Sequence, residues 1–267
     1  MSTIIAIIVL MTAIGLFFGL ILAFANKKFA VEINPLIHMV EDILPKGQCG
    51  ACGYAGCQAY AEAVVLDNKV SPNLCIPGKA EVAKKVAELT GKAVADVESK
   101  IASVRCANPI SIAIKKYKYS GIKDCLAASI MHMGPKDCTY GCIGFGTCTK
   151  QCHFGAIKLN QNSLPVVDAR KCTGCGKCAS VCPKKIIQMI PAKSHVEVKC
   201  SSKDKGAIAR KHCSVACIGC GICKKLCPYD AIRIENNLAI VDSSICIEKC
   251  EKSICLEKCP TGAIKNN

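Results

Sequence analysis

The sequence predicts an α+β chain in which one N-terminal membrane helix precedes a set of small, cysteine-rich modules. Two observations carry this prediction: residues 4–25 form an unbroken apolar run, and 24 of the 267 residues are cysteine. Aromatic residues make up only 4% of the chain, and tryptophan is absent. Because small domains with few large side chains bury little apolar surface, bound metal is expected to supply much of the folding free energy.

The apolar run from Ile4 to Ala25 is long enough for a transmembrane helix, which needs about 20 residues. A cleaved signal peptide is the alternative, but the charged start of a signal peptide is missing. We therefore predict a single-pass anchor over residues 1–26. Lys27 and Lys28 follow it, and the positive-inside rule then places the C-terminal domains in the cytoplasm, at the inner membrane. The run has no ionisable residue and so offers no ion pathway of its own.

The first cysteine group follows the anchor closely. An amphipathic linker is expected over 27–45, and a small helical [4Fe–4S] domain over 46–92. Glycines interleave with the cysteines and let backbone amides turn toward cluster sulfurs. A structural zinc site is the alternative for this group taken alone. The predicted ligands are Cys49, Cys52, Cys57 and Cys75.

The second half of the chain contains a repeat of the spacing CxxCxxCxxxCP. One copy covers residues 172–183 and the other 217–228, and each has a looser partner run, at 138–152 and 246–260. This spacing is typical of bacterial ferredoxins. The repeat predicts two tandem 2[4Fe–4S] ferredoxin modules, over 134–190 and 213–267.

In such modules three cysteines of a run hold one cluster, and the fourth crosses to the other cluster. Four ligand sets follow from this rule. They are Cys138, Cys142 and Cys148 with Cys182; Cys172, Cys175 and Cys178 with Cys152; Cys217, Cys220 and Cys223 with Cys259; and Cys246, Cys250 and Cys255 with Cys227.

Four cysteines lie outside these sets. Cys106 and Cys125 belong to a connecting segment over 93–133, Cys200 to an insertion over 191–212, and Cys213 begins the second module. Four thiols are enough for one more cubane, and ordinary buried thiols are the alternative. The sequence therefore predicts five [4Fe–4S] clusters, or six if these four thiols bind together.

Every strongly patterned site is ligated by cysteine alone, which leaves no open iron for a substrate and favours electron relay over catalysis. The chain has no phosphate-binding loop and no dinucleotide fingerprint, so neither flavin nor NAD is expected on it, and no complete active site. The formal net charge of +15 is offset by the negative charge of thiolate-bound clusters. Nucleic-acid binding is therefore not expected.

The chain resembles the RnfB components of the Rnf complexes, the family of ion-translocating ferredoxin:NAD⁺ oxidoreductases. The likeness rests on the N-terminal helix, the segment LPKGQCGACGYAGC at 44–57 with Cys75, and the ferredoxin modules. The stretch GPKDCTYGCIGFGTC at 134–148 resembles the long form of RnfB. The resemblance implies electron transfer from reduced soluble ferredoxin to partner subunits that bind flavin and NAD⁺. Membrane subunits of the same complex would move the ions.

Two other functions are compatible with parts of the pattern. A polyferredoxin subunit of a membrane hydrogenase or another reductase would also carry many clusters, but the Cys49–Cys75 segment after a membrane helix argues against it. A membrane-tethered redox sensor, or a zinc-rich interaction protein, would not need five or six clusters in series.

Overall fold

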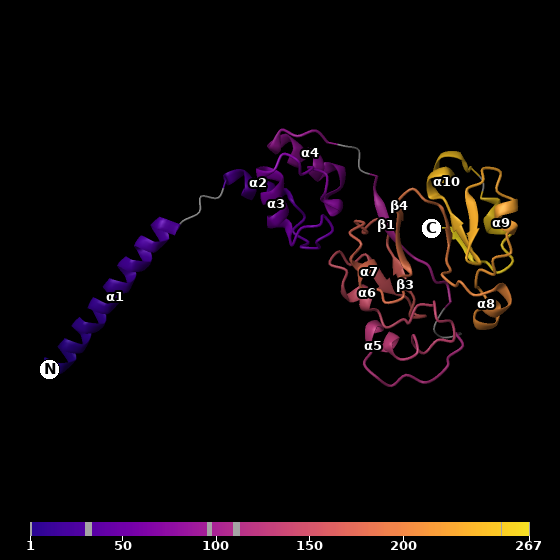
Figure 1. Ribbon diagram of the computed structural model, residues 1–267, viewed down its shortest axis with the longest axis horizontal. Coiled ribbons are helices and arrows are strands. Elements are labelled where there is room, and N and C mark those ends of the chain that lie inside the picture. The colour runs from indigo at the N-terminus through magenta and orange to yellow at the C-terminus, as the bar shows by residue number, and fades with distance from the viewer. Residues whose placement is uncertain (1, 30–33, 95–97, 109–112, 252, 267) are drawn as a thin grey trace.

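The computed structural model describes residues 2–29, 34–94, 98–108, 113–251 and 253–266, so residues 30–33 of the predicted linker lie outside it (Figure 1). A long N-terminal helix is followed by a helical domain and two small α+β modules. The predicted fold class and its order of parts are confirmed.

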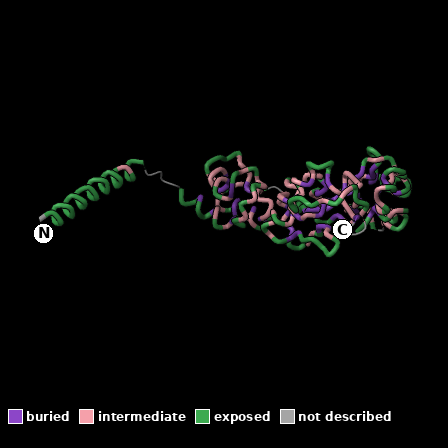
Figure 2. Tube along the Cα trace, turned by 90° about the horizontal axis from the view of Figure 1, so that it is seen from below, coloured by how far each residue is buried: buried purple, intermediate pink, exposed green. Residues whose placement is uncertain are grey.

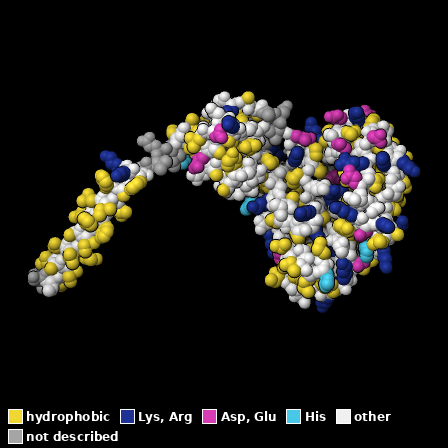
Figure 3. Space-filling model, viewed as in Figure 1, with side chains coloured by type: hydrophobic (Ala, Val, Ile, Leu, Met, Phe, Trp, Pro, Cys, Tyr) yellow, Lys and Arg dark blue, Asp and Glu magenta, His cyan; other side chains and the backbone are white. Residues whose placement is uncertain are grey.

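Helix α1 (Ser2–Phe29) is apolar along its length and stands apart from the rest of the chain (Figures 1, 2 and 3). Residues Thr3–Phe29 are long and apolar enough to cross a membrane, and they are exposed. The hydroxyl of Thr12 donates to the carbonyl oxygen of Ile8 within the helix at 2.9 Å. The helix thus satisfies its own polar groups, as a segment in hydrocarbon must.

The helical domain packs around a small apolar core that includes Val40, Tyr60, Val64 and Val86. Behind this core, the ammonium group of Lys92 donates to the carbonyl oxygens of residues 64, 67 and 70 at 2.6–3.0 Å. These bonds close the loop that leads toward the fourth cysteine. The domain consists of α2 (Pro35–Ile43), α3 (Cys57–Leu66), a 3-10 turn (Ile76–Gly78) and α4 (Lys79–Thr90).

Module 1 contains two antiparallel strand pairs with short helices between them. In the first pair the register runs from Lys100 opposite Pro191 to Val104 opposite Ile187. One strand of this pair therefore comes from the segment before the cysteine runs. The pairs are β1 (Lys100–Val104) with β4 (Ile187–Pro191) and β2 (Ile157–Leu159) with β3 (Pro165–Val167); the helices are α5 (Cys125–Ile130), α6 (Thr147–Lys150) and α7 (Lys177–Ser180).

Module 2 repeats this plan. Its first strand comes from the insertion between the cysteine runs and pairs with the last strand of the chain. The pairs are β5 (Val196–Val198) with β8 (Ile264–Asn266) and β6 (Ile232–Glu235) with β7 (Leu238–Val241); the helices are α8 (Gly206–His212), α9 (Ile222–Lys225), α10 (Ser243–Lys249) and α11 (Ile254–Glu257).

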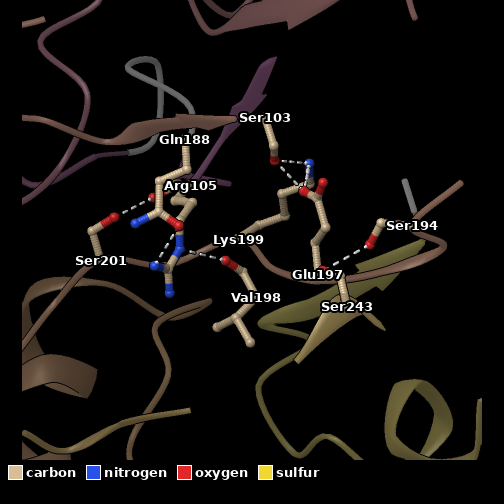
Figure 4. A network of polar contacts seen from close by, with 9 residues as sticks. All are labelled: Ser103, Arg105, Gln188, Ser194, Glu197, Val198, Lys199, Ser201 and Ser243. Carbon is tan, nitrogen blue, oxygen red and sulfur yellow. Dashed lines mark hydrogen bonds and ion pairs between the residues drawn. The ribbon is translucent and has the colours of Figure 1, made fainter. Parts of the chain in front are cut away.

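A polar network joins the two modules (Figure 4). Buried Glu197 on β5 pairs with Lys199 and accepts a hydrogen bond from Ser103 on β1. Beside them, the guanidinium group of Arg105 donates to Gln188 at 3.0 Å and to the carbonyl oxygen of residue 198 at 3.4 Å. A buried carboxylate is tolerated only when it is paired, so this network fixes the modules against each other.

Candidate metal centres

All 24 cysteines lie within the described residues, and none forms a disulfide. Every one except Cys220 is buried or half-buried. Several of them surround compact cavities of 340–390 Å³.

The N-terminal cavity, about 340 Å³, is lined by Cys49, Cys52, Cys57 and Cys75. The side-chain oxygen of Gln48 accepts a hydrogen bond from the backbone N–H of Cys57 at 2.9 Å, which fixes the ligand loop against α3. Burial raises the pKa of the Cys75 thiol to about 11, and the other three thiols add to the shift. The structure thus brings together the four cysteines that the spacing selects.

In module 1 a second group consists of Cys152, Cys172, Cys175 and Cys178. Burial raises the pKa of the Cys178 thiol to about 12, and the other three thiols add to the shift, as does Cys148 of the neighbouring group. Backbone amides point at the sulfurs: the N–H of Ala102 donates to Cys172 at 3.4 Å. This group is also the one that the spacing selects.

The other group in module 1 differs from the spacing-based set. Its cavity, about 390 Å³, is lined by Cys125, Cys142, Cys148 and Cys182. Helix α5 supplies Cys125, whose backbone N–H donates to the hydroxyl of Thr147 at 2.8 Å. That hydrogen bond brings the start of α5 beside Cys148. Cys138, which the spacing places here, does not line this cavity.

Between the modules lies a cavity of about 370 Å³ lined by four distant cysteines, namely Cys106, Cys138, Cys200 and Cys213. Two contacts hold these segments together. The hydroxyl of Ser201 donates to the carbonyl oxygen of Arg105 at 3.0 Å, next to two of the cysteines. The ring of His212 contacts the carboxylate of Asp137, next to the other two.

Cationic side chains surround this inter-module cavity. Arg105, Lys136 and Lys199 all line it. Lys136 is only 4% exposed, and its ammonium group donates to the carbonyl oxygen of Asn108 at 3.0 Å. Buried cations need an anionic partner, and a cluster bound by four thiolates supplies one.

Module 2 holds two groups that agree with the spacing. One cavity, about 340 Å³, is lined by Cys217, Cys220, Cys223 and Cys259. The second group consists of Cys227, Cys246, Cys250 and Cys255. Burial raises the pKa of the Cys246 thiol to about 11, and the other three thiols of that group add to the shift.

An internal alignment explains the different group in module 1. The run CIGFGTC at 142–148 aligns without gaps with CIGCGIC at 217–223. Cys142 then corresponds to Cys217, Cys148 to Cys223, and Phe145 stands where Cys220 would be. The run thus has no cysteine at its middle position, and Cys125 from α5 lines the cavity instead. The spacing rule missed Cys125 because it counts Cys138 as the start of the run.

The thiol groups fit [4Fe–4S] clusters rather than zinc. Within the described residues, no three cysteine, histidine or acidic side chains converge on a single ion, as the roughly 2.3 Å zinc–sulfur bonds require. Backbone amides instead donate to sulfurs across the structure, as from Cys142 to Cys106 at 3.4 Å and from Ala239 to Cys217 at 3.5 Å. Such bonds are typical of cluster ligands. On binding iron, these thiols would release their protons, and the raised pKa values mean that they keep their protons without it.

Family profiles match three parts of the chain. An Fe–S cluster profile covers residues 44–77, a 4Fe-4S dicluster profile covers 140–187, and a 4Fe-4S binding profile covers 216–233. The chain therefore binds [4Fe–4S] clusters.

Relatives cover the chain almost completely. The RnfB component of the proton-translocating ferredoxin:NAD⁺ oxidoreductase complex of Clostridium ljungdahlii is 58% identical over 99% of this chain and 93% of its own length. The chain belongs to the RnfB family. RnfB of the Na⁺-translocating complex of Acetobacterium woodii is 43% identical over 88% of this chain and 72% of its own length. The corresponding component of the ion-translocating oxidoreductase complex of Methanosarcina acetivorans is 38% identical over 92% of each chain.

Membership of the RnfB family decides between the functions that the sequence left open. The chain is an iron–sulfur electron-transfer subunit of a ferredoxin:NAD⁺ oxidoreductase complex. Other Rnf subunits are its partners, and α1 associates it with the membrane. The predictions of family and function are confirmed, in preference to the hydrogenase polyferredoxin and to the zinc protein.

Proposed function

We propose that the chain holds six [4Fe–4S] clusters in one line and passes electrons from reduced soluble ferredoxin to flavin-bearing Rnf subunits. All 24 cysteines then serve as ligands, four to each cluster. Two ligand sets differ from the spacing rule: Cys125 replaces Cys138 in module 1, and Cys138 completes the inter-module set with Cys106, Cys200 and Cys213.

The observation that carries this proposal is a series of electrostatic interactions and hydrogen bonds between neighbouring thiol groups. Cys49 of the N-terminal group adds to the burial-raised pKa of Cys175 in module 1. Within module 1, Cys148 of one group adds to the burial-raised pKa of Cys178 in the other group. The other group of module 1 meets the inter-module group where the backbone N–H of Cys142 donates to the sulfur of Cys106.

The series continues into module 2. The sulfur of Cys200, in the inter-module group, accepts hydrogen bonds from the backbone of Ser202 and of Cys217. Cys217 belongs to the next group. In the last step, Cys223 on α9 and Cys227 just beyond this helix are four residues apart and belong to two adjacent groups. Since electron tunnelling falls off steeply with distance, a series of neighbouring clusters favours a single wire. The inter-module cluster supplies the step that two separate ferredoxin modules would lack.

Sidedness follows from charge. Lys27 and Lys28 lie in the last turn of α1, so the positive-inside rule places the cluster domains in the cytoplasm, where soluble ferredoxin is available. An amine-reactive label that cannot cross membranes should modify the lysines of the domains in inverted vesicles and not in intact cells.

Iron analysis and substitution of single cysteines test the six-cluster assignment. Iron analysis of the full chain, purified anaerobically, should give about 24 iron atoms, four for each cluster. Cys138→Ala and Cys213→Ala should remove the same Mössbauer or EPR signal, because both residues hold the inter-module cluster. Cys125→Ala and Cys148→Ala should each remove one other signal, and it should be the same signal in both variants.

The spacing-based set predicts the opposite result. If Cys138→Ala removed the same signal as Cys148→Ala, and Cys125→Ala left every cluster intact, the inter-module cluster would be wrong. Cys57→Ala is the matched control, since it affects only the N-terminal cluster in both schemes.

A further inference from the structure

Cys220 is the one exposed cysteine of the chain, all of whose cysteines lie within the described residues. It is the middle ligand of the first group in module 2 and precedes the short helix α9. A ligand that reaches the surface brings its cluster within short tunnelling distance of a partner. The position therefore suits exchange of electrons with another protein.

The surroundings of Cys220 combine apolar and basic side chains. Ile222, Leu226 and Tyr229 are 38–42% exposed. Lys224 and Lys225 are also exposed and lie on the same short helix. We call the surface formed by these six residues the Cys220 face. A small apolar centre with charged neighbours is the composition of a transient docking surface.

The corresponding surface of module 1 is already covered. Phe145, in the position of Cys220, lies against the ring of Tyr119 with ring centroids 5.4 Å apart. Phe154, in the position of Tyr229, packs on the N-terminal cluster domain, where a Cβ at Gly47 would come within 3.0 Å of its ring. In module 1 this surface thus receives another cluster-bearing domain. In module 2 the same surface is open, at the end of the molecule away from α1 (Figure 1).

The charge of the Cys220 face selects its partner. A protein that presents a thiolate-bound cluster presents negative charge, and two lysines next to the ligand attract it. The surface around the last cluster is mixed instead: Glu248, Glu251 and Glu257 are exposed there together with Lys249 and Lys258. An acidic iron–sulfur protein is therefore favoured at α9 and not at α10 and α11.

We propose that the Cys220 face is the docking surface for reduced ferredoxin and the point where electrons enter the chain. The inference rests on the proposed function, in which ferredoxin is the donor. In each encounter one cluster of the ferredoxin is oxidised by one electron. The cluster at Cys217, Cys220, Cys223 and Cys259 is reduced by that electron, and no bond or proton changes.

Charge reversal tests this surface. The full chain with its clusters, as wild type and as the Lys224→Glu/Lys225→Glu variant, is mixed with a reduced bacterial 2[4Fe–4S] ferredoxin in a stopped-flow instrument. Loss of electrostatic steering should slow reduction at low ionic strength by about tenfold or more. The rate of the variant should also no longer fall as salt is added. A neutral Lys224→Gln/Lys225→Gln variant should lie between the two.

A matched control is available in the N-terminal domain. Lys84 and Lys85 are adjacent and exposed on α4, and Lys84→Glu/Lys85→Glu makes the same change of charge far from Cys220. That variant should react with ferredoxin like the wild type. Iron content, EPR spectra and reduction by dithionite should be unchanged in every variant.

The outcomes separate the docking surface from the proposed function. If ferredoxin reduces the wild type and the Lys224→Glu/Lys225→Glu variant equally fast, the docking surface lies elsewhere while ferredoxin remains the donor. If dithionite reduces the wild-type chain and ferredoxin does not, the proposed function fails and the docking surface with it. If the variant no longer co-purifies with other Rnf subunits, the Cys220 face is a subunit contact and the inference is overturned.

Discussion

At the scale of single residues, we expect Lys136 to have the clearest effect on redox chemistry. It is buried beside the inter-module cavity, and its positive charge would stabilise the proposed cluster there when that cluster gains an electron. We expect Lys136→Met to lower the midpoint potential of that cluster. A tenfold fall in the ratio of reduced to oxidised cluster, equivalent to about 59 mV for one electron, is a reasonable magnitude. Potentiometric EPR titration measures it.

Lys115 is the control for this change. It is exposed and pairs with Lys136 through an isolated β-bridge, so Lys115→Met removes a charge that water already screens. Its titration should match that of the wild type. If both variants titrate identically with full iron content, the buried charge does not tune the cluster.

Single residues also show how far the sequence predicts the sites. The N-terminal set and the tight runs are local patterns, and the structure groups them as their spacing indicates. Cys125 and Cys200 line their cavities from distant segments, and no local spacing identifies them. Phe145 in the place of a cysteine was the one available signal, since a cluster run without its middle ligand needs a thiol from elsewhere.

At the scale of elements, β1 and β5 determine how the modules meet. Lys199 and Ser103 both contact one oxygen of the buried carboxylate of Glu197 between these strands, and its other oxygen is buried without a hydrogen-bond partner. Lys199→Met leaves that carboxylate without its cation, which typically costs about 3 kcal/mol. We expect the cluster absorbance to be lost at a lower urea concentration than in the wild type.

The exposed pair on β6 is the matched control. Arg233 and Glu235 are each at least half exposed, so Arg233→Met should cost less than about 1 kcal/mol. Equal urea midpoints for the two variants would mean that the β1–β5 network does not stabilise the joint. The sequence predicted neither β1 nor β5, because each pairs with a strand many residues away and neither carries a local turn signal.

At the scale of the whole molecule, the order of the six thiol groups along the chain's length predicts two different consequences of losing one cluster. In the proposed line of clusters, electrons that enter at the Cys220 face must cross the inter-module cluster to reach module 1 and the N-terminal domain. The last cluster, assigned to Cys246, Cys250 and Cys255 with Cys227, lies outside that route. Position in the line, and not the number of clusters, should therefore decide the effect of a lost cluster.

Cys106→Ala and Cys250→Ala test this in the intact Rnf complex. Each removes one ligand of one cluster, but we expect only Cys106→Ala to abolish ferredoxin-dependent NAD⁺ reduction. Freeze-quench EPR of that variant should show module 2 reduced by ferredoxin, with module 1 and the N-terminal cluster still oxidised. Cys250→Ala should keep most of the activity. Equal losses in two variants that retain their other clusters would mean that the clusters do not form a single line.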